Sequence, residues 1–145
     1  MKVVLYSENP EILKKISQPV TKFDRKLIDI VNDMFRVTET QRGVGLAAIQ
    51  LGIDKRILVI NNKEGFRGAF INPEMDISVS EGWESDQEGC LSAPGKYVQK
   101  NRHTEVRVTY QNLQGKPATV DLSGRDARIF QHEFDHLNGI MCIDE

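Results

Sequence analysis

Cysteine and histidine are scarce in this 145-residue chain, which has two cysteines and three histidines. Long apolar runs are missing too: no stretch approaches the roughly 20 residues of a membrane-spanning helix. The N-terminal sequence MKVVLYSENPEILKK lacks the apolar core of a signal peptide. We therefore expect a protein of a reducing compartment that does not contact a membrane. Disulfides are disfavoured in such a compartment, which favours a metal-binding or catalytic role for a cysteine.

An excess of charge of one sign is also missing. Charged residues make up 28% of the chain, the formal net charge is −2, and no basic stripe is present. Nucleic acid is therefore not expected as a direct partner. A chain of this length falls within the size range of one domain and should bury roughly 70% of the surface that its unfolded form exposes. We expect a single domain over residues 1–145.

Two helices are predicted, one towards each end of the chain. Apolar residues recur at steps of three and four over residues 23–39, which is typical of one face of an amphipathic helix. Thr21 is expected to cap this helix. Ser123, with Asp126 three residues later, is expected to open the second helix, and Asn138-Gly139 to close it.

The segments between these helices favour strands. KRILVINN is typical of a buried strand, and residues 68–79 form a second extended segment that Pro73 interrupts. Residues 105–122 alternate polar and apolar side chains on both sides of the turn at 112–115, as a hairpin does. Strands in the middle and helices near the ends, without regular alternation, favour an α+β fold.

The stretch QHEFDH, residues 131–136, has the spacing of a metal site. Residues four apart share one face of a helix, so His132 and His136 can present ring nitrogens to one ion. Glu133 is adjacent but turned aside, which suits a base that acts on water beside the metal. The alternative is a helix that carries two histidines by chance, which is less well supported in a chain with three histidines.

A catalytic ion usually has three protein ligands, so a third ligand is needed. Little follows the histidine helix, and we expect the ligand to lie upstream. Cys90 is the candidate, because its surroundings, QEGCLSAPG, favour irregular backbone. Its thiolate would offset the charge of the metal. A structural core cysteine is the alternative for Cys90, whereas Cys142 is interpreted as a small buried hydrophobic residue.

A glycine motif, GVGLAA at residues 43–48, formally matches a dinucleotide-binding loop. However, RVTETQR before it does not resemble a strand, and no β-α-β unit follows. We favour a segment in which Gly43 and Gly45 let a substrate backbone lie alongside as an added strand, with Gln50 offering an amide donor nearby. A tight turn that leads into the next strand is the other interpretation.

Together GVGLAAIQ, EGCLS and QHEFDHLNG resemble the three signature motifs of the peptide deformylases, in order and in separation. LKKISQPV, RILVIN and FINPE extend the resemblance over roughly the whole chain. It implies an α+β fold with antiparallel β-sheets around a central HExxH-bearing helix and a second, N-terminal helix. It also implies a hydrolase that removes the formyl group from N-terminal formylmethionine of newly made proteins, releasing formate. The implied metal is Fe(II), with Zn, Ni or Co as substitutes.

The resemblance implies roles for individual residues. The metal ligands would be Cys90, His132 and His136. The catalytic groups would be Glu133 as acid and base, and Gln50 with the backbone N–H of Leu91 as the oxyanion hole. Arg102 would pair with Glu88. The substrate-binding residues would be Gly43, Val44, Gly45, Glu88, Gly89, Tyr97 and Ile129, with Val44, Ile129 and the ring of His132 around the methionine side chain.

Two features depart from the family pattern. Common bacterial members continue into a further basic C-terminal helix, whereas this chain ends at MCIDE. We therefore expect a short form, reminiscent of members carried by viruses of bacteria, in which the chemistry survives. Tyr97 stands where many relatives have a basic or other residue, which would shift preference beyond methionine.

The expected partners are nascent N-formylmethionyl peptides and, transiently, the ribosome. The expected form is a cytoplasmic monomer of the bacterial cytosol, with an organelle as the alternative.

Two other functions stay open from the residues alone. One is an H-E-x-x-H peptidase that acts on ordinary amides, against which Cys90 and the lack of a downstream ligand both count. The other is a noncatalytic metal-binding module, which would need a fourth protein ligand.

Overall fold

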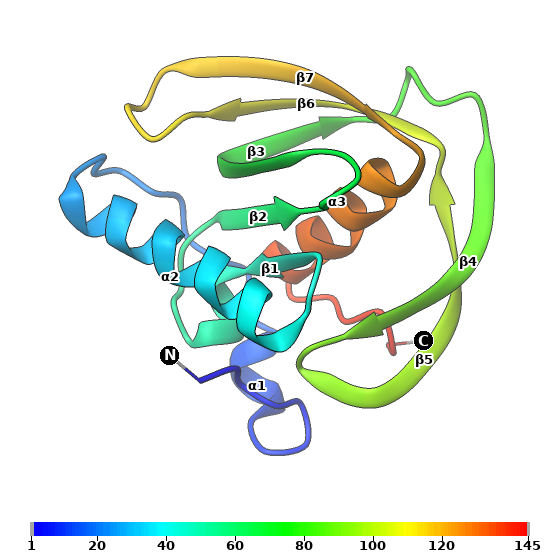
Figure 1. Cartoon of the computed structure of the whole chain (residues 1–145), viewed down its shortest axis with the longest axis horizontal. Helices are drawn as coiled ribbons and strands as arrows, with labels where there is room; N and C mark the ends of the chain where they lie inside the picture. The colour runs from blue at the N-terminus through cyan, green and yellow to red at the C-terminus, as the bar shows by residue number, and fades with distance from the viewer. Residues whose placement is uncertain (1, 145) are drawn as a thin grey trace.

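The computed structural model describes residues 2–144, which form an α+β fold of antiparallel sheets and helices, as predicted (Figure 1). Within these residues the larger sheet has the strand order β1-β2-β3-β6-β7. Its strands are β1 (Gly45–Ala47), β2 (Ile57–Asn61), β3 (Arg67–Asp76), β6 (Glu105–Gln111) and β7 (Pro117–Ser123). The smaller sheet is a long, curved hairpin of β4 (Trp83–Cys90) and β5 (Ala93–His103) at one side of the larger sheet.

The helices described are α1 (Pro10–Leu13), α2 (Arg25–Gln41), the 3₁₀ helix η1 (Ala48–Leu51) and α3 (Gly124–Leu137). In residues 2–144, none of them is both long and apolar enough to cross a membrane. The two longer helices cover opposite faces of the sheet at its β1–β2 edge (Figure 1).

Strand β2 separates the two larger apolar clusters of the core. All five of its residues are buried, and successive side chains of a strand point to opposite faces. Leu58 and Ile60 pack with Phe130 of α3, whereas Ile57 and Val59 pack with the apolar face of α2. A strand covered on both faces needs a continuous apolar run, which explains why ILVIN shows no polar alternation.

Helix α2 begins two residues later than predicted, and its cap is a different residue. Oδ1 of Asp24 accepts a hydrogen bond from the backbone N–H of Leu27 at 3.1 Å, so Asp24, rather than Thr21, is the N-cap. At the other end Arg42 adopts a left-handed φ of 56°, and the N–H of Gly43 donates to the carbonyl of Thr38. The chain then turns directly into β1.

The other predicted elements are present with small differences. Pro73 lies where the register between β3 and β6 shifts, which accounts for the interruption noted in the sequence. The hairpin predicted over 105–122 is the β6–β7 pair. Helix α3 follows Ser123 as predicted, but this serine makes no side-chain cap; Asp126 instead accepts hydrogen bonds from Asn62 and from the N–H of Phe66.

The glycine motif does not form a dinucleotide-binding loop. Gly45 lies in β1, an edge strand that pairs antiparallel with β2, and the chain continues into the 3₁₀ turn of η1. A β-α-β unit would require a helix and a parallel partner strand at this point. The motif instead exposes one edge of β1 beside α3 and the end of β4.

Candidate metal centre and active site

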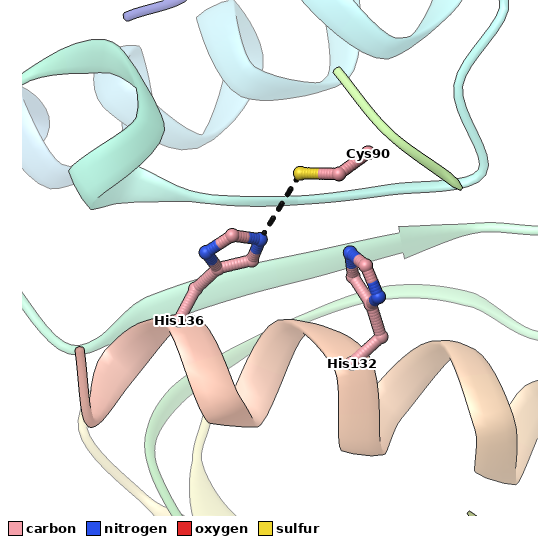
Figure 2. A group of neighbouring side chains, drawn as sticks. All are labelled: Cys90, His132 and His136. Carbon is pink, nitrogen blue, oxygen red and sulfur yellow. Dashed lines mark hydrogen bonds between the residues drawn. The ribbon is translucent and has the colours of Figure 1, made fainter. Parts of the chain in front are cut away.

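Helix α3 presents both histidines on one face, opposite Cys90 (Figure 2). Sγ of Cys90 lies 3.3 Å from Nε2 of His136, and potential ligand atoms of Cys90, His132 and His136 all lie within 4.8 Å of one another. The ligands of a tetrahedral ion with bonds of about 2.0–2.3 Å are separated by roughly 3.5 Å. The three side chains are therefore close to the spacing that one ion requires.

Cys90 reaches this position because β4 ends irregularly. Pairing in the hairpin is regular up to Gly89–Tyr97 and then shifts, so that Cys90 pairs with Ala93. Such a bulge redirects a side chain at the end of a strand. A cysteine distant from the histidines in the sequence thus comes to lie above them (Figure 2).

Glu88 fixes the orientation of His132. Oε1 of Glu88 lies 2.9 Å from Nδ1 of His132, and Arg102 donates to both carboxylate oxygens at 2.9 Å, as predicted for this pair. Burial alone would raise the pKa of Glu88, but hydrogen bonds from Arg102 and His132 hold that pKa well below its ordinary value. An ionised carboxylate only accepts, so Nδ1 of His132 carries a hydrogen, and Nε2 is the ring nitrogen that a metal could bind.

A second group of potential ligands, Glu88, His132 and Cys142, is less suitable for an ion. Nδ1 of His132 is engaged by Glu88, and the carboxylate of Glu88 accepts from Arg102 and Arg128 as well. Cys142 is 4% exposed and packs within the protein, as expected for a small hydrophobic residue. Cys90, His132 and His136 therefore form the better metal centre.

The electrostatics of the histidines also fit a cation. Burial lowers the pKa of His136 to about 3, so its ring is neutral, as a ligand must be. Burial also disfavours a charged His132, but the charge of Glu133 and the hydrogen bonds that the ring can donate to Cys142, Cys90 and Glu88 raise the pKa of His132 well above its ordinary value. The surroundings of His132 thus favour positive charge at this point, which is what a divalent ion supplies.

Glu133 is 5% exposed and lies against β1. Burial raises the pKa of Glu133 to about 7, although the positive charge of His132 opposes this shift. Among the residues that the structure describes, none forms a hydrogen bond with Oε1 of Glu133. A Cβ atom at Gly45 would lie 2.9 Å from Oε2, so only glycine leaves room for the carboxylate here. A buried carboxyl group that titrates near neutral pH is suited to proton transfer.

The side-chain amide of Gln50 has a defined orientation. Its Oε1 accepts from the N–H of Ala47 at 2.9 Å, which places Nε2 on the opposite side. Nε2 lies 3.2 Å from Oγ of Ser92 and 3.4 Å from Sγ of Cys90. The amide donor therefore points towards the metal centre, and Leu91 follows Cys90 in the same turn.

These groups lie in a cleft of about 1150 Å³. The cleft brings together every predicted metal-binding, catalytic and substrate-binding residue except His136, which is fully buried; Arg102, the predicted partner of Glu88, does not line the cleft either. The predicted residues that line the cleft are Gly43, Val44, Gly45, Gln50, Glu88, Gly89, Cys90, Leu91, Tyr97, Ile129, His132 and Glu133.

Tyr97 lies on the hairpin wall of this cleft and is 66% exposed. It pairs with Gly89, and a Cβ atom at Gly89 would lie 2.7 Å from Cε1 of Tyr97. The absence of a side chain at Gly89 thus lets the tyrosine ring lie directly over the β4 backbone. The ring therefore forms an aromatic surface on this wall of the cleft.

Two contributors were missed in the sequence. Arg128 donates to Oε2 of Glu88 at 2.7 Å, and Asp135 forms an ion pair with Arg102, also at 2.7 Å. Both lie on α3, so their spacing relative to the histidines was visible. The sequence did not indicate which residues Arg128 and Asp135 contact, because Glu88 and Arg102 lie on the β4–β5 hairpin.

A half-buried cysteine and two buried histidines, with a buried carboxyl group beside them in an open cleft, are the arrangement expected of a metallohydrolase site. The comparisons with known proteins specify the family. The polypeptide deformylase family model matches residues 1–145. The peptide deformylase of Thermotoga neapolitana is 44% identical over 133 residues, covering 92% of this chain and 80% of that protein.

Solved structures agree. The peptide deformylase of Thermotoga maritima superimposes with a TM-score of 0.92 at 40% identity, covering 99% of this chain and 95% of that one. The deformylase of the Vibrio parahaemolyticus bacteriophage VP16T, in complex with actinonin, gives a TM-score of 0.86 at 35% identity, covering 97% and 99%. The chain belongs to the peptide deformylase family, whose members are metal-dependent hydrolases that remove the formyl group from N-terminal formylmethionine.

Proposed function

We propose that Cys90, His132 and His136 bind a single divalent ion and that Glu133 is the acid and base of formyl hydrolysis. The observation that carries this proposal is the buried carboxyl group of Glu133 beside a three-residue ligand set, at the floor of a cleft. When bound, the ion would polarise the formyl carbonyl and lower the pKa of water. With three protein ligands, one position remains for water or substrate.

Glu133 takes the proton from the attacking water. The carbon–nitrogen bond of the formyl amide then breaks, and Glu133 returns the proton to the departing amine. The products are formate and a peptide with a free methionine N-terminus. A pKa of about 7 suits both steps, because the carboxyl group can accept and release a proton near neutral pH.

Gln50 and the backbone N–H of Leu91 stabilise the negative charge that develops on the formyl oxygen. The contact of Oε1 with Ala47 supports this role for Gln50, because it holds the amide with its donor towards the site before substrate arrives. Preorganised donors of this kind require no rearrangement as charge develops.

The peptide backbone lies along the free edge of β1, as an added strand at Gly43, Val44 and Gly45. The N–H of Gly43 already donates to Thr38 and the carbonyl of Val44 already accepts from Asn61, so we assign the backbone contacts mainly to the N–H of Val44 and to Gly45. The methionine side chain lies against Val44, Ile129 and the ring of His132. Residues after methionine extend along Glu88, Gly89 and Tyr97.

The physiological metal in this proposal is Fe(II), with Zn, Ni or Co as substitutes. One thiolate and two imidazoles accept all of these ions. We further propose that the chain acts as one monomeric domain in the bacterial cytosol, on nascent chains at the ribosome.

The test uses protein purified without oxygen, since a ferrous ion beside a thiolate is sensitive to oxidation. One metal ion per chain is confirmed first, and formate release is then measured with formyl-Met-Ala-Ser. The matched substrates are Met-Ala-Ser and acetyl-Met-Ala-Ser. The proposal requires rapid formate release with intact peptide bonds. Cleavage between residues of the unformylated peptide would indicate a peptidase instead.

A further inference from the structure

Arg128 lies one helical turn before His132 on α3, and its side chain is only 13% exposed. Nη1 donates to Oε2 of Glu88 at 2.7 Å and to the carbonyl of Lys100 at 3.1 Å, and Nη2 donates to the carbonyl of Glu84. The guanidinium of Arg128 thus contacts β4 at Glu84 and Glu88 and β5 at Lys100.

The contact with Glu88 completes the hydrogen bonds of that carboxylate. Oε1 accepts from His132 and from Nη2 of Arg102, and Oε2 accepts from Nε of Arg102 and from Arg128. A carboxylate has about four lone-pair positions, so all of them are used. Arg102 also pairs with Asp135. The two arginines together balance the charges of Glu88 and Asp135.

The hairpin depends on such contacts for its position. β4 and β5 pair with each other and are not part of the five-stranded sheet. Cys90 lies at the end of β4, whereas His132 and His136 lie on α3. Side chains of α3 that contact the hairpin therefore help to set the distance between the thiolate and the two imidazoles.

We propose that Arg128 is a positioning residue of the metal centre. It holds Glu88 in the orientation that fixes His132, and it fastens the strand that ends in Cys90 to the helix that carries the histidines. The inference rests on the ligand set of the proposed function. Loss of Arg128 should reduce metal affinity by about 10- to 100-fold, as is typical when a group that orients a histidine ligand is removed.

The test compares Co(II)-loaded wild type with Arg128→Met and Arg128→Lys. Metal release to a competing chelator gives the affinity and the dissociation rate, and the visible absorption of Co(II) reports the ligand geometry. Arg107→Met is the matched control, because Arg107 forms an ion pair with Asp121 in which both side chains are largely exposed. We expect weaker binding and an altered spectrum in Arg128→Met, substantial rescue in Arg128→Lys, and wild-type behaviour in Arg107→Met.

Wild-type affinity and spectrum in Arg128→Met would overturn the inference and leave Arg128 as a clamp between helix and hairpin. If this variant does not fold, Arg128→Gln takes its place under the same criterion. The proposed function fails differently: wild type itself would then lack a thiolate-to-Co(II) absorption band that disappears in Cys90→Ser. The spectrum of wild type thus separates an error in the ligand set from an error about Arg128.

Discussion

Nδ1 of His132 lies 2.9 Å from Oε1 of Glu88, across the interface between α3 and the β4–β5 hairpin. The carboxylate is 6% exposed and is held by guanidinium groups as well. This contact leaves Nε2 of His132 as the nitrogen that can bind a metal. The metal centre therefore extends beyond its three ligands.

Glu88→Gln should weaken metal binding by about 10- to 100-fold, because an amide no longer fixes the histidine as an ionised carboxylate does. Chelator competition measures the change. Asp121→Asn is the control, since it removes a carboxylate that pairs with an arginine at an exposed site. An unchanged affinity in Glu88→Gln would show that His132 needs no such partner.

Gln50→Ala should keep the metal and lose about 100- to 1,000-fold in turnover, the usual cost of one oxyanion-hole donor. Formate release at equal metal content measures the loss. Gln99→Ala is the control, because Gln99 is exposed and contacts only Ser85 among the hydrogen bonds of the described side chains. A Gln50→Ala enzyme with unchanged rate, or one without metal, would rule out the proposed role.

Gly45→Ala should reduce turnover by up to about 100-fold while metal content stays constant, because a small displacement of a catalytic group has a large effect on rate. The added Cβ would lie 2.9 Å from Oε2 of Glu133 and 2.8 Å from Cγ2 of Ile129. Gly82→Ala is the matched control, since a Cβ there meets nothing within 4 Å. Equal activities of the two variants would mean that the position of Glu133 is not critical.

Tyr97→Ala should change selectivity between formylated peptides rather than lower all rates equally. The ring of Tyr97 covers Gly89 on the wall of the cleft. The measurement is kcat/KM for peptides that differ after methionine, with large apolar and small polar residues compared. A uniform effect on every peptide would argue against contact with the substrate side chains.

The sequence predicted those elements whose residues show a strong local pattern. The apolar spacing of α2, the β-branched run of β2 and the alternation of β6 and β7 all led to correct elements. The cap of α2 was wrong because Thr21 and Asp24 both have suitable side chains, and backbone geometry decides between them.

The β4–β5 hairpin was not predicted as a pair of strands. β4 reads WESDQEGC, and its first five residues are exposed, so it has none of the apolar alternation that marks a half-buried strand. β1 is similarly inconspicuous, with three residues that include Gly45. Neither strand has a clear pattern of its own, and each is recognised by the strand with which it pairs, β2 for β1 and β5 for β4. Residues of both line the cleft.

The site was more predictable than the strands that support it. The spacing of His132 and His136 indicated a metal directly, and the missing third ligand pointed upstream to Cys90. The partners of Glu88 are different, because Arg102 came only from the family resemblance and Arg128 was not predicted at all. Contacts between an exposed hairpin and a helix 40 residues away leave no local pattern in the sequence.

The central claim is that Glu133 transfers protons beside an ion held by Cys90, His132 and His136. The most direct test measures formate release from formyl-Met-Ala-Ser by wild type and by Glu133→Ala, both purified without oxygen and matched for metal content. We predict rapid release by wild type, one metal ion per chain in both proteins, and a loss of at least about 100-fold in the variant. Near-normal release by a fully metallated Glu133→Ala protein would contradict the account.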